Sequence, residues 1–411
     1  MNDQFSAAMR QAARLTRASQ VTQATRIIQD ALAGRGTIEN AGTASPQNLV
    51  PQVPQRPRLA LCDADAEIVG PAAAVAASTV AARPKRLRMP LAAVVSALRG
   101  GKISPAMPGS NCRGLRAPAA LPPLPDGARF VARSFACAAG ARDYRLYVPA
   151  SGREKPRGLI VMLHGCKQDP DDFAVGTHMN ANAETHGLLV AYPGQTGAAN
   201  VSACWNWFNP ADQKRDSGEP AIIAGLTRAL IAEFGLDPAG VFVAGLSAGG
   251  AMAAVMGEAY PDLYAAVGIH SGLATGLASD VMSAFAAMRA DTAPASPRPR
   301  TGTGQRMIVF HGSADATVHP ANARQIVAAA SARPGAARVR HDGTAAGRRF
   351  ERSVISGSDG SAQVECWLIK GAGHAWSGGQ PGGSFTDRQG PDASAQMVRF
   401  FLEAPPPSGP A

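Results

Sequence analysis

The sequence predicts an α/β protein with a mostly parallel central sheet, helices on both faces of the sheet, and a helical and disordered N-terminal leader. Three observations predict this. Short apolar runs alternate with helix-like stretches from about Arg129 onward. A serine stands in a glycine-flanked turn between one such run and one such stretch. The composition of the 411-residue chain also changes near residue 129. Only the part after this residue has the regular apolar pattern of a folded domain.

The region before this domain divides into two segments. Residues 1–34 place Val21, Ala24, Ile28 and Ala31 at helical spacing and stop at Gly34, which predicts an amphipathic helical leader. Residues 35–128 are rich in Pro, Ala and Gly without a sustained period, which predicts a largely disordered basic linker. The α/β domain is then expected over residues 129–403, with a disordered Pro-rich tail at 404–411.

The net charge of +10 belongs to the leader and linker rather than to the domain. Residues 1–130 contain 16 Lys and Arg against 7 Asp and Glu, and the remainder is close to neutral. A solvated basic tail or an anionic surface as partner both explain this excess. A specific nucleic-acid partner is not expected, since no aromatic residues interleave the basic stretch.

Other classes of protein are excluded by what the sequence lacks. No run approaches the ~20 apolar residues of a membrane span, and the start has no export signal, so a cytoplasmic protein is expected. The six cysteines show no paired CxxC spacing, and no HExxH, P-loop or dinucleotide motif occurs. We therefore expect no metal and no organic cofactor.

The periodicity within the domain predicts its elements in order. Seven strands are expected, at 144–148, 159–163, 188–191, 241–244, 266–269, 307–310 and 364–369. Five helices are expected, at 221–234, 248–259, 281–289, 321–332 and 392–403.

The candidate nucleophile is Ser247, in the turn Gly245-Leu246-Ser247-Ala248-Gly249. A serine at the crest of a tight strand-to-helix turn needs glycines two residues before and after it, because side chains there would collide with the neighbouring strand and helix. The helix N-terminus also places N–H groups beside the charge that develops in acyl transfer. The alternative is an ordinary turn with a capping serine.

A base and an acid are expected after this serine in the order acid, then histidine. His374 is the preferred base because it lies in a glycine-rich loop directly after a predicted strand, with His319 and His341 as alternatives. Asp315 is the preferred acid because it follows the strand at 307–310 and so emerges at the carboxyl edge of the sheet. A helix-capping role is the alternative for Asp315.

Further site residues are predicted around the nucleophile. The turn His164-Gly165-Cys166 follows the strand at 159–163, so the N–H groups of Cys166 and Ala248 are the candidate oxyanion hole. Three tryptophans are candidates for binding substrate: Trp205, Trp207 and Trp376. Core packing is the alternative for the aromatic block that contains Trp205 and Trp207.

Five motifs follow one another along the chain. They are His164-Gly165-Cys166 with Gln168 and Asp169, Cys204-Trp205-Asn206-Trp207-Phe208, Gly245 to Gly250, Asp315 with Val318, and Gly373 to Gly379. Together they resemble the poly(3-hydroxybutyrate) depolymerase family of α/β-hydrolase esterases. The resemblance covers about residues 142–401, and the amphipathic start is similar to the leader of bacterial members that lack a signal peptide.

The resemblance implies an α/β-hydrolase fold, a triad of Ser247, Asp315 and His374, and an oxyanion hole at Cys166 and Ala248. It also implies a disulfide between Cys166 and Cys204, and a substrate that is a polyester or oligomer of short-chain 3-hydroxyalkanoates. Related esterases act on feruloyl or acetyl groups of plant polysaccharide, and the motifs do not separate these substrates. A non-catalytic protein of the polyhydroxyalkanoate granule is a further alternative.

The chain departs from the polymer-degrading members in one respect. Those members are commonly secreted and carry a separate substrate-binding domain, and neither an export signal nor such a domain is evident here. The expected location is therefore cytoplasmic or granule-associated, with the leader docking on the granule surface. An extracellular location is the alternative.

Overall fold

The computed structural model describes residues 121–403 except 153, 291–305, 331–336 and 358–359. The predicted leader (1–34), most of the predicted linker and the predicted tail (404–411) lie outside the described residues.

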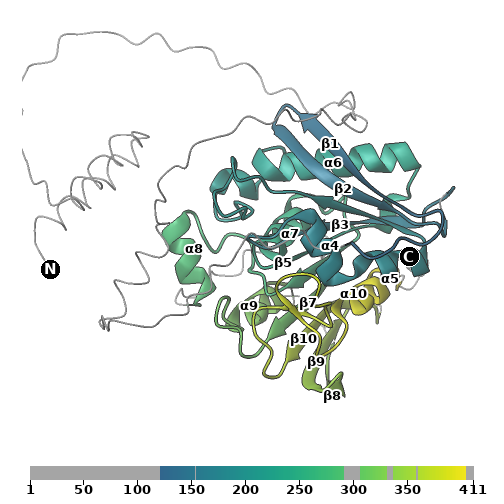
Figure 1. Cartoon of the computed structure of the whole chain (residues 1–411). Coiled ribbons are helices and arrows are strands. Elements are labelled where there is room, and N and C mark those ends of the chain that lie inside the picture. Colours follow the sequence, from purple (N-terminus) through teal and green to yellow (C-terminus); the bar gives the residue numbers. More distant parts are fainter. Residues whose placement is uncertain (1–120, 153, 291–305, 331–336, 358–359, 404–411) are drawn as a thin grey trace, which may run out of the picture. The chain divides into compact units, whose positions relative to one another are not determined.

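A ten-stranded sheet runs through the described part, in the order β1-β2-β4-β3-β5-β6-β7-β10-β9-β8 (Figure 1). Its strands are β1 (Arg129–Cys137), β2 (Gly140–Val148), β3 (Gly158–Leu163), β4 (Leu188–Pro193), β5 (Val241–Leu246), β6 (Ala266–His270), β7 (Arg306–Gly312), β8 (Ala337–Ala345), β9 (Arg348–Ser356) and β10 (Ala362–Ile369). The six strands from β4 to β10 in this order are parallel, and the pairs at both ends of the sheet are antiparallel. The carboxyl ends of the parallel strands therefore share one edge.

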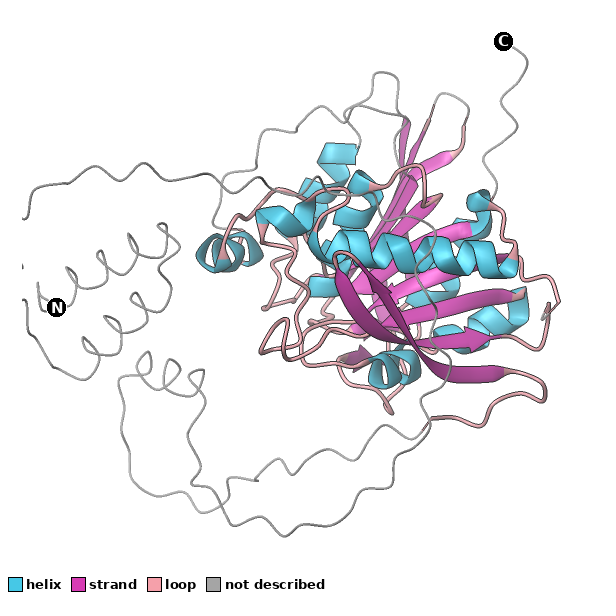
Figure 2. Cartoon of the chain, turned by 90° about the horizontal axis from the view of Figure 1, so that it is seen from above, coloured by secondary structure: helices cyan, strands magenta, loops and turns pink. Residues whose placement is uncertain are grey.

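Helices cover both faces of the sheet (Figure 2). They are α4 (Pro170–Thr177), α5 (Met179–His186), α6 (Gly218–Phe234), α7 (Ala248–Ala259), α8 (Val281–Met288), α9 (Ala321–Ala330) and α10 (Ala393–Leu402). Helices α6, α7, α8 and α9 contribute to the core on one face, and α4, α5 and α10 to the core on the other. No helix in residues 121–403 that the structure describes is long and apolar enough to cross a bilayer.

The central strands are buried on both sides, as β3 illustrates. All six of its residues are buried, with Leu159, Val161 and Leu163 in one core and Ile160 and Met162 in the other. A strand covered by helices on both faces is apolar at every position, because successive side chains point to opposite faces. This is why the sequence showed continuous apolar runs there rather than alternation.

The structure confirms the predicted α/β-hydrolase fold and contains all seven predicted strands and all five predicted helices. Strands β1, β8 and β9 and helices α4 and α5 were not predicted. In β8 most residues are exposed, so the strand has no apolar face for periodicity to detect. Helices α4 and α5 show no helical period in their sequences, because α4 buries a continuous run from Phe173 to Thr177 and α5 buries only Met179 and Ala183.

The structure also describes the last residues of the predicted linker. Residues 121–125 are exposed and line a pocket together with Phe130, Tyr147 and Ala174, and the Ala128 N–H donates to the Pro125 carbonyl at 3.0 Å.

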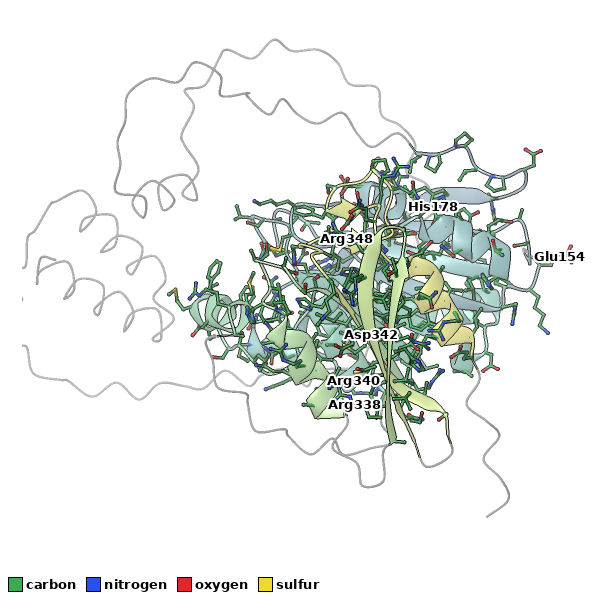
Figure 3. The ribbon with its side chains drawn as sticks, turned by 90° about the horizontal axis from the view of Figure 1, so that it is seen from below. Glu154, His178, Arg338, Arg340, Asp342 and Arg348 are labelled. Atoms are coloured by element: carbon green, nitrogen blue, oxygen red, sulfur yellow. A yellow bond between two sulfur atoms is a disulfide. The ribbon has the colours of Figure 1, made fainter. Side chains whose placement is uncertain are left out.

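Charged side chains occupy the outer strand of the sheet. Arg338, Arg340 and Asp342 project along β8 (Figure 3), and both arginines are exposed. Charged residues on an edge strand discourage pairing with another chain, which suits the open edge of this sheet.

Candidate active site

Ser247 lies in a strained turn between β5 and α7. Its backbone has φ of 57° and ψ of −118°, and its N–H donates to the His270 carbonyl at 2.9 Å. A Cβ on Gly249 would come within 1.9 Å of the Leu163 carbonyl oxygen, and one on Gly245 within 2.4 Å of the Gly249 carbonyl group. Both glycines of the motif are therefore required by close backbone approach, as the sequence predicted. A positive φ at a non-glycine residue is strain of the kind that is maintained at functional sites.

Asp315 and His374 meet beside this turn. The Nδ1 atom of His374 lies 2.8 Å from Oδ2 of Asp315. The other oxygen of Asp315 accepts the N–H groups of Thr317 and Val318, both at 2.9 Å. Burial alone would raise the pKa of Asp315, but these hydrogen bonds and the neighbouring His374 outweigh it and hold the pKa below its ordinary value. The carboxylate is therefore ionised at neutral pH and fixes the orientation of the imidazole.

His270 connects the serine turn to the loop of His374. Its carbonyl accepts the Ser247 N–H, and its ring Nε2 accepts the N–H of Ser377 at 3.0 Å. Burial, with His311 and His374 nearby, lowers the pKa of His270 to about 3, so the ring is neutral. Since Nε2 accepts, the proton resides on Nδ1, which faces Ser271 Oγ at 3.2 Å. The structure therefore places His270 as a support between the serine turn and the loop of His374.

No hydrogen bond joins Ser247 Oγ to His374 among the residues that the structure describes. The two residues follow β5 and β10, whose carboxyl ends are on the same edge of the sheet, and His270 connects their loops.

The turn after β3 lies against the nucleophile. A Cβ added to Gly165 would be 3.6 Å from Ser247 Cβ, so the backbone of this turn comes close to the serine. Within the described part of the chain, neither the Cys166 N–H nor the Ala248 N–H donates to a protein acceptor. Two unpaired N–H groups beside a serine are what an oxyanion hole requires.

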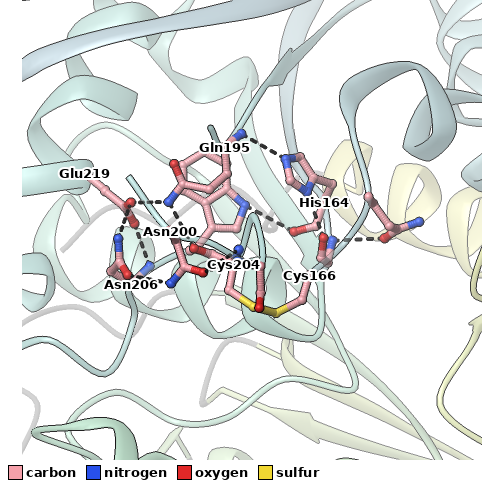
Figure 4. The surroundings of a disulfide bond; sticks show 11 residues. His164, Cys166, Gln195, Asn200, Cys204, Asn206 and Glu219 are labelled. Atoms are coloured by element: carbon pink, nitrogen blue, oxygen red, sulfur yellow. Dashed lines mark hydrogen bonds between the residues drawn. A yellow bond between two sulfur atoms is a disulfide. The ribbon is translucent and has the colours of Figure 1, made fainter. Parts of the chain in front are cut away.

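Cys166 and Cys204 form a disulfide, with their Cα atoms 4.2 Å apart (Figure 4). The bridge ties the turn after β3 to the loop that contains the aromatic block. A backbone bond from Lys167 N to Ser202 O at 2.9 Å closes the same contact. The pairing implied by the resemblance is therefore present in the structure.

A buried carboxylate, Glu219, binds the loop that contains Cys204. Glu219 is 4 % exposed and accepts the N–H of Asn206 at 2.7 Å and the amide of Asn206 at 2.9 Å, besides bonds from Gln195 and Arg142 (Figure 4). Burial raises the pKa of Glu219 despite these donors. The backbone N–H of Gln195 donates to His164 Nε2 at 3.0 Å, which extends the network to the turn after β3. Sequence reasoning missed Glu219, because one glutamate in the first turn of a helix carries no signal of burial.

The tryptophans expected to bind substrate lie in the core. Trp205 and Trp376 are 0 % and 1 % exposed, and their indole N–H groups donate to His164 O and Ser394 Oγ, both at 3.1 Å. Trp207 is 6 % exposed and packs edge to face on Phe208. The burial of these side chains favours core packing over a substrate wall, and the indole N–H groups of Trp205 and Trp376 already have partners inside the protein.

The described residues contain no group of three or more His, Cys, Asp or Glu side chains placed to hold a metal ion. No hydrogen bond joins either alternative base to Asp315 in the part of the chain that the structure describes: His341 is on the exposed strand β8, and His319 accepts the N–H of Ala321 at 3.2 Å. His374 Nδ1 lies 2.8 Å from Asp315 Oδ2, and His311 Nε2 lies 3.5 Å from the same oxygen.

Comparison with known proteins points to ester hydrolases. The family model described as Esterase PHB depolymerase matches residues 142–349. The chain is 32 % identical over 238 residues to poly(3-hydroxyalkanoate) depolymerase C of Paucimonas lemoignei, covering 56 % of this chain and 57 % of that protein. It is 30 % identical over 190 residues to feruloyl esterase B of Neurospora crassa, covering 42 % and 64 %. The chain thus spans about three fifths of the length of these relatives.

One solved structure and one further relative are also similar to this chain. An acetyl xylan esterase from Aspergillus awamori is 23 % identical, with 57 % of this chain and 89 % of that chain covered at a TM-score of 0.47. A probable acetylxylan esterase A of Neosartorya fischeri is 29 % identical over 193 residues, which is 43 % of this chain and 51 % of that protein.

Proposed function

The chain belongs to the Esterase PHB depolymerase family, and from this premise we propose that it is a serine ester hydrolase with Ser247, His374 and Asp315 as its triad. The observation that carries the proposal is the 2.8 Å contact between His374 Nδ1 and a buried, ionised Asp315. This contact holds the proton of His374 on Nδ1 and leaves Nε2 free to take a proton from the serine.

The reaction is two-step acyl transfer. His374 takes the Ser247 proton as the hydroxyl attacks the ester carbonyl, and the N–H groups of Cys166 and Ala248 hold the oxygen that becomes negative. His374 then protonates the departing alcohol, and a water activated by the same histidine releases the acid and restores Ser247. These steps use no metal and no organic cofactor.

The substrate that we propose first is poly(3-hydroxybutyrate), or other polyesters and oligomers of short-chain 3-hydroxyalkanoates. The name of the Paucimonas lemoignei relative supports this choice. The second candidate is a feruloyl or acetyl ester of a polysaccharide, which is supported by the names of the Neurospora crassa and Neosartorya fischeri relatives.

We also propose a partner and a location for the protein. The basic linker and amphipathic leader would dock the enzyme on a polyhydroxyalkanoate granule in the cytoplasm. The disulfide supports the extracellular alternative, because such bonds persist mainly in oxidising compartments.

One panel of substrates tests the proposal. Wild-type protein and Ser247→Ala are compared on p-nitrophenyl esters of increasing chain length, 3-hydroxybutyrate oligomers, amorphous granules, and feruloyl and acetyl polysaccharides. We expect the variant to lose at least about 10³-fold in kcat. Ser279→Ala, at an exposed serine, is the matched control and should keep full activity. The polymer class that is hydrolysed faster, polyester or polysaccharide ester, identifies the substrate. If a well-folded wild type hydrolysed none of these substrates, the non-catalytic granule protein would remain as the function.

The granules in this panel also test whether the leader and linker bind to the granule surface. Removing residues 1–120 leaves residues 121–125, which line a pocket of the domain, in place. Sedimentation with granules should decrease while hydrolysis of the soluble esters is unchanged. Equal sedimentation of both proteins would exclude the leader and linker as the docking segment.

A further inference from the structure

Gln168 is a buried polar residue that the proposed mechanism does not use. It is 5 % exposed and lies two residues after Cys166, just before α4. Its side-chain amide makes contacts in two directions, one to the turn after β3 and one to the segment that follows His374. Each direction reaches a part of the site.

Toward the turn, Gln168 binds the peptide groups on both sides of Gly165. Its side-chain Oε1 accepts the Gly165 N–H at 3.0 Å, and its backbone N–H donates to the Gly165 carbonyl at 3.2 Å. The same carbonyl lies 2.8 Å from His164 Nδ1. The Gly165 carbonyl and the Cys166 N–H belong to one planar trans peptide and point in opposite directions. The backbone bond therefore holds the peptide that carries the Cys166 N–H, and the side chain holds the peptide before it, so Gly165 is fixed from both sides and the direction of the Cys166 N–H is set.

Away from the turn, Gln168 contacts the segment between β11 (Trp376–Ser377) and β12 (Thr386–Asp387). Its Nε2 donates to the Ser384 carbonyl at 3.2 Å, to Ser384 Oγ at 3.3 Å, and to Asp172 Oδ2 at 2.9 Å. Asp172 in turn accepts the Ser384 N–H at 2.8 Å. The next residue, Phe385, accepts the N–H of Trp376, two positions after His374, at 2.7 Å.

We propose that Gln168 is a positioning residue that aims the Cys166 N–H at the developing oxyanion and couples its turn to the loop of His374. The inference rests on the proposed function. It also explains why the residue is an amide: its oxygen accepts from Gly165 while its NH₂ group, with two N–H donors, reaches Asp172 and Ser384. A carboxylate there would face the carboxylate of Asp172, and an apolar side chain would leave both ends unpaired.

The test compares Gln168→Glu, Gln168→Met and the double variant Gln168→Glu with Asp172→Asn. The single variants should lose about 10- to 100-fold in kcat with KM changed less than about threefold, because a misaimed oxyanion donor weakens only the transition state. Affinity for a trifluoromethyl ketone analogue of the substrate should decrease by a similar factor. The double variant exchanges the carboxylate and the amide and should recover at least about tenfold of the loss in kcat.

Two controls accompany the test. Gln396→Glu makes the same change on α10, where Oε1 accepts from Arg399 Nε at 2.8 Å, and should leave kcat unchanged. Ser384→Ala removes one partner of Gln168 at a partly buried position and should lower kcat by about two- to fivefold, which keeps the inference testable if a Gln168 variant fails to fold.

Retention of full kcat and inhibitor affinity by a folded Gln168 variant would overturn the inference, as would a loss confined to KM or no recovery in the double variant. Failure of the proposed function looks different, since wild-type protein would then hydrolyse no ester and Ser247→Ala would change nothing. In that case the role of Gln168 falls with it.

Discussion

The two turns on either side of Ser247 reach the same edge of the sheet but are held by different chemistry. The turn after β3 is fixed by a disulfide at Cys166 and by the neutral amide of Gln168. The turn after β7 is fixed by the charge of Asp315, which accepts two backbone N–H groups and His374. The first turn should therefore respond to reductant, and the second to loss of the carboxylate charge.

The largest effect is expected from removing that charge. Asp315→Asn keeps the size of the side chain but presents an amide to His374, which favours the tautomer with its proton toward the serine. We expect kcat to decrease by about 10³- to 10⁴-fold with the fold intact. Steady-state hydrolysis of a p-nitrophenyl ester measures this.

Asp342→Asn, at an exposed position on β8, is the control for the charge change and should keep wild-type kcat. A loss below tenfold in Asp315→Asn would mean that another group orients His374.

An intermediate effect is expected from breaking the disulfide. The bridge closes a loop with a sequence separation of 38. Its loss in Cys204→Ala with Cys166→Ala should lower the free energy of unfolding by about 3 to 4 kcal/mol in the chain-entropy model. Urea unfolding followed by circular dichroism measures this, and dithiothreitol should destabilise the wild type but not the double variant.

The free cysteines provide the control for this prediction. Cys137→Ala should leave the response to dithiothreitol intact, because Cys137 is outside the bridge. Equal stability of oxidised and reduced wild type would show that hydrogen bonds such as Lys167 N to Ser202 O are sufficient to hold the turn.

The smallest effect concerns a property that the two turns share. Burial lowers the pKa of His164 beside one turn and of His311 beside the other below the ordinary 6.5, so both rings are neutral when folded. The unfolded chain binds these protons as the pH falls below about 6.5, so stability is full above that value and is lost below it. Each histidine contributes a slope of at most about 1.4 kcal/mol per pH unit. Asp315, whose pKa is lowered, adds a loss only below its ordinary value of 3.8.

Urea unfolding at a series of pH values from 7 to 5 tests this expectation. His164→Gln should flatten the slope, whereas His341→Gln, at an exposed position, should not. A stability that does not change over this range would contradict the assignment of neutral buried histidines.

The parts of the molecule that could be predicted from the sequence are those where one residue type meets one physical need. Gly245 and Gly249 were predictable because backbone carbonyls approach within 2.4 Å of where a Cβ would be. The buried strand β3 was predictable because both of its faces are apolar. Strand β8 was not, since its residues are held by backbone pairing with β9 alone and its side chains face solvent.

For the site, the order of motifs along the chain indicated Ser247, Asp315 and His374, and the contact between Asp315 and His374 is present in the structure. The roles of Trp205 and Trp376 could not be predicted in the same way. The sequence around a tryptophan is the same whether its ring faces substrate or the core. The partners of the indole N–H, which the structure gives, distinguish the two roles. The bridging positions of Gln168 and His270 depend on residues more than 100 positions away, which no local pattern contains.

The disulfide also changes what cleavage of the chain would do. Residues 167–203 lie between its two cysteines, and Val201 within them is 98 % exposed. A protease that cut the chain there would produce two fragments that stay covalently joined, with Cys166 still fastened to the aromatic block. The nicked molecule would separate into its pieces only after reduction.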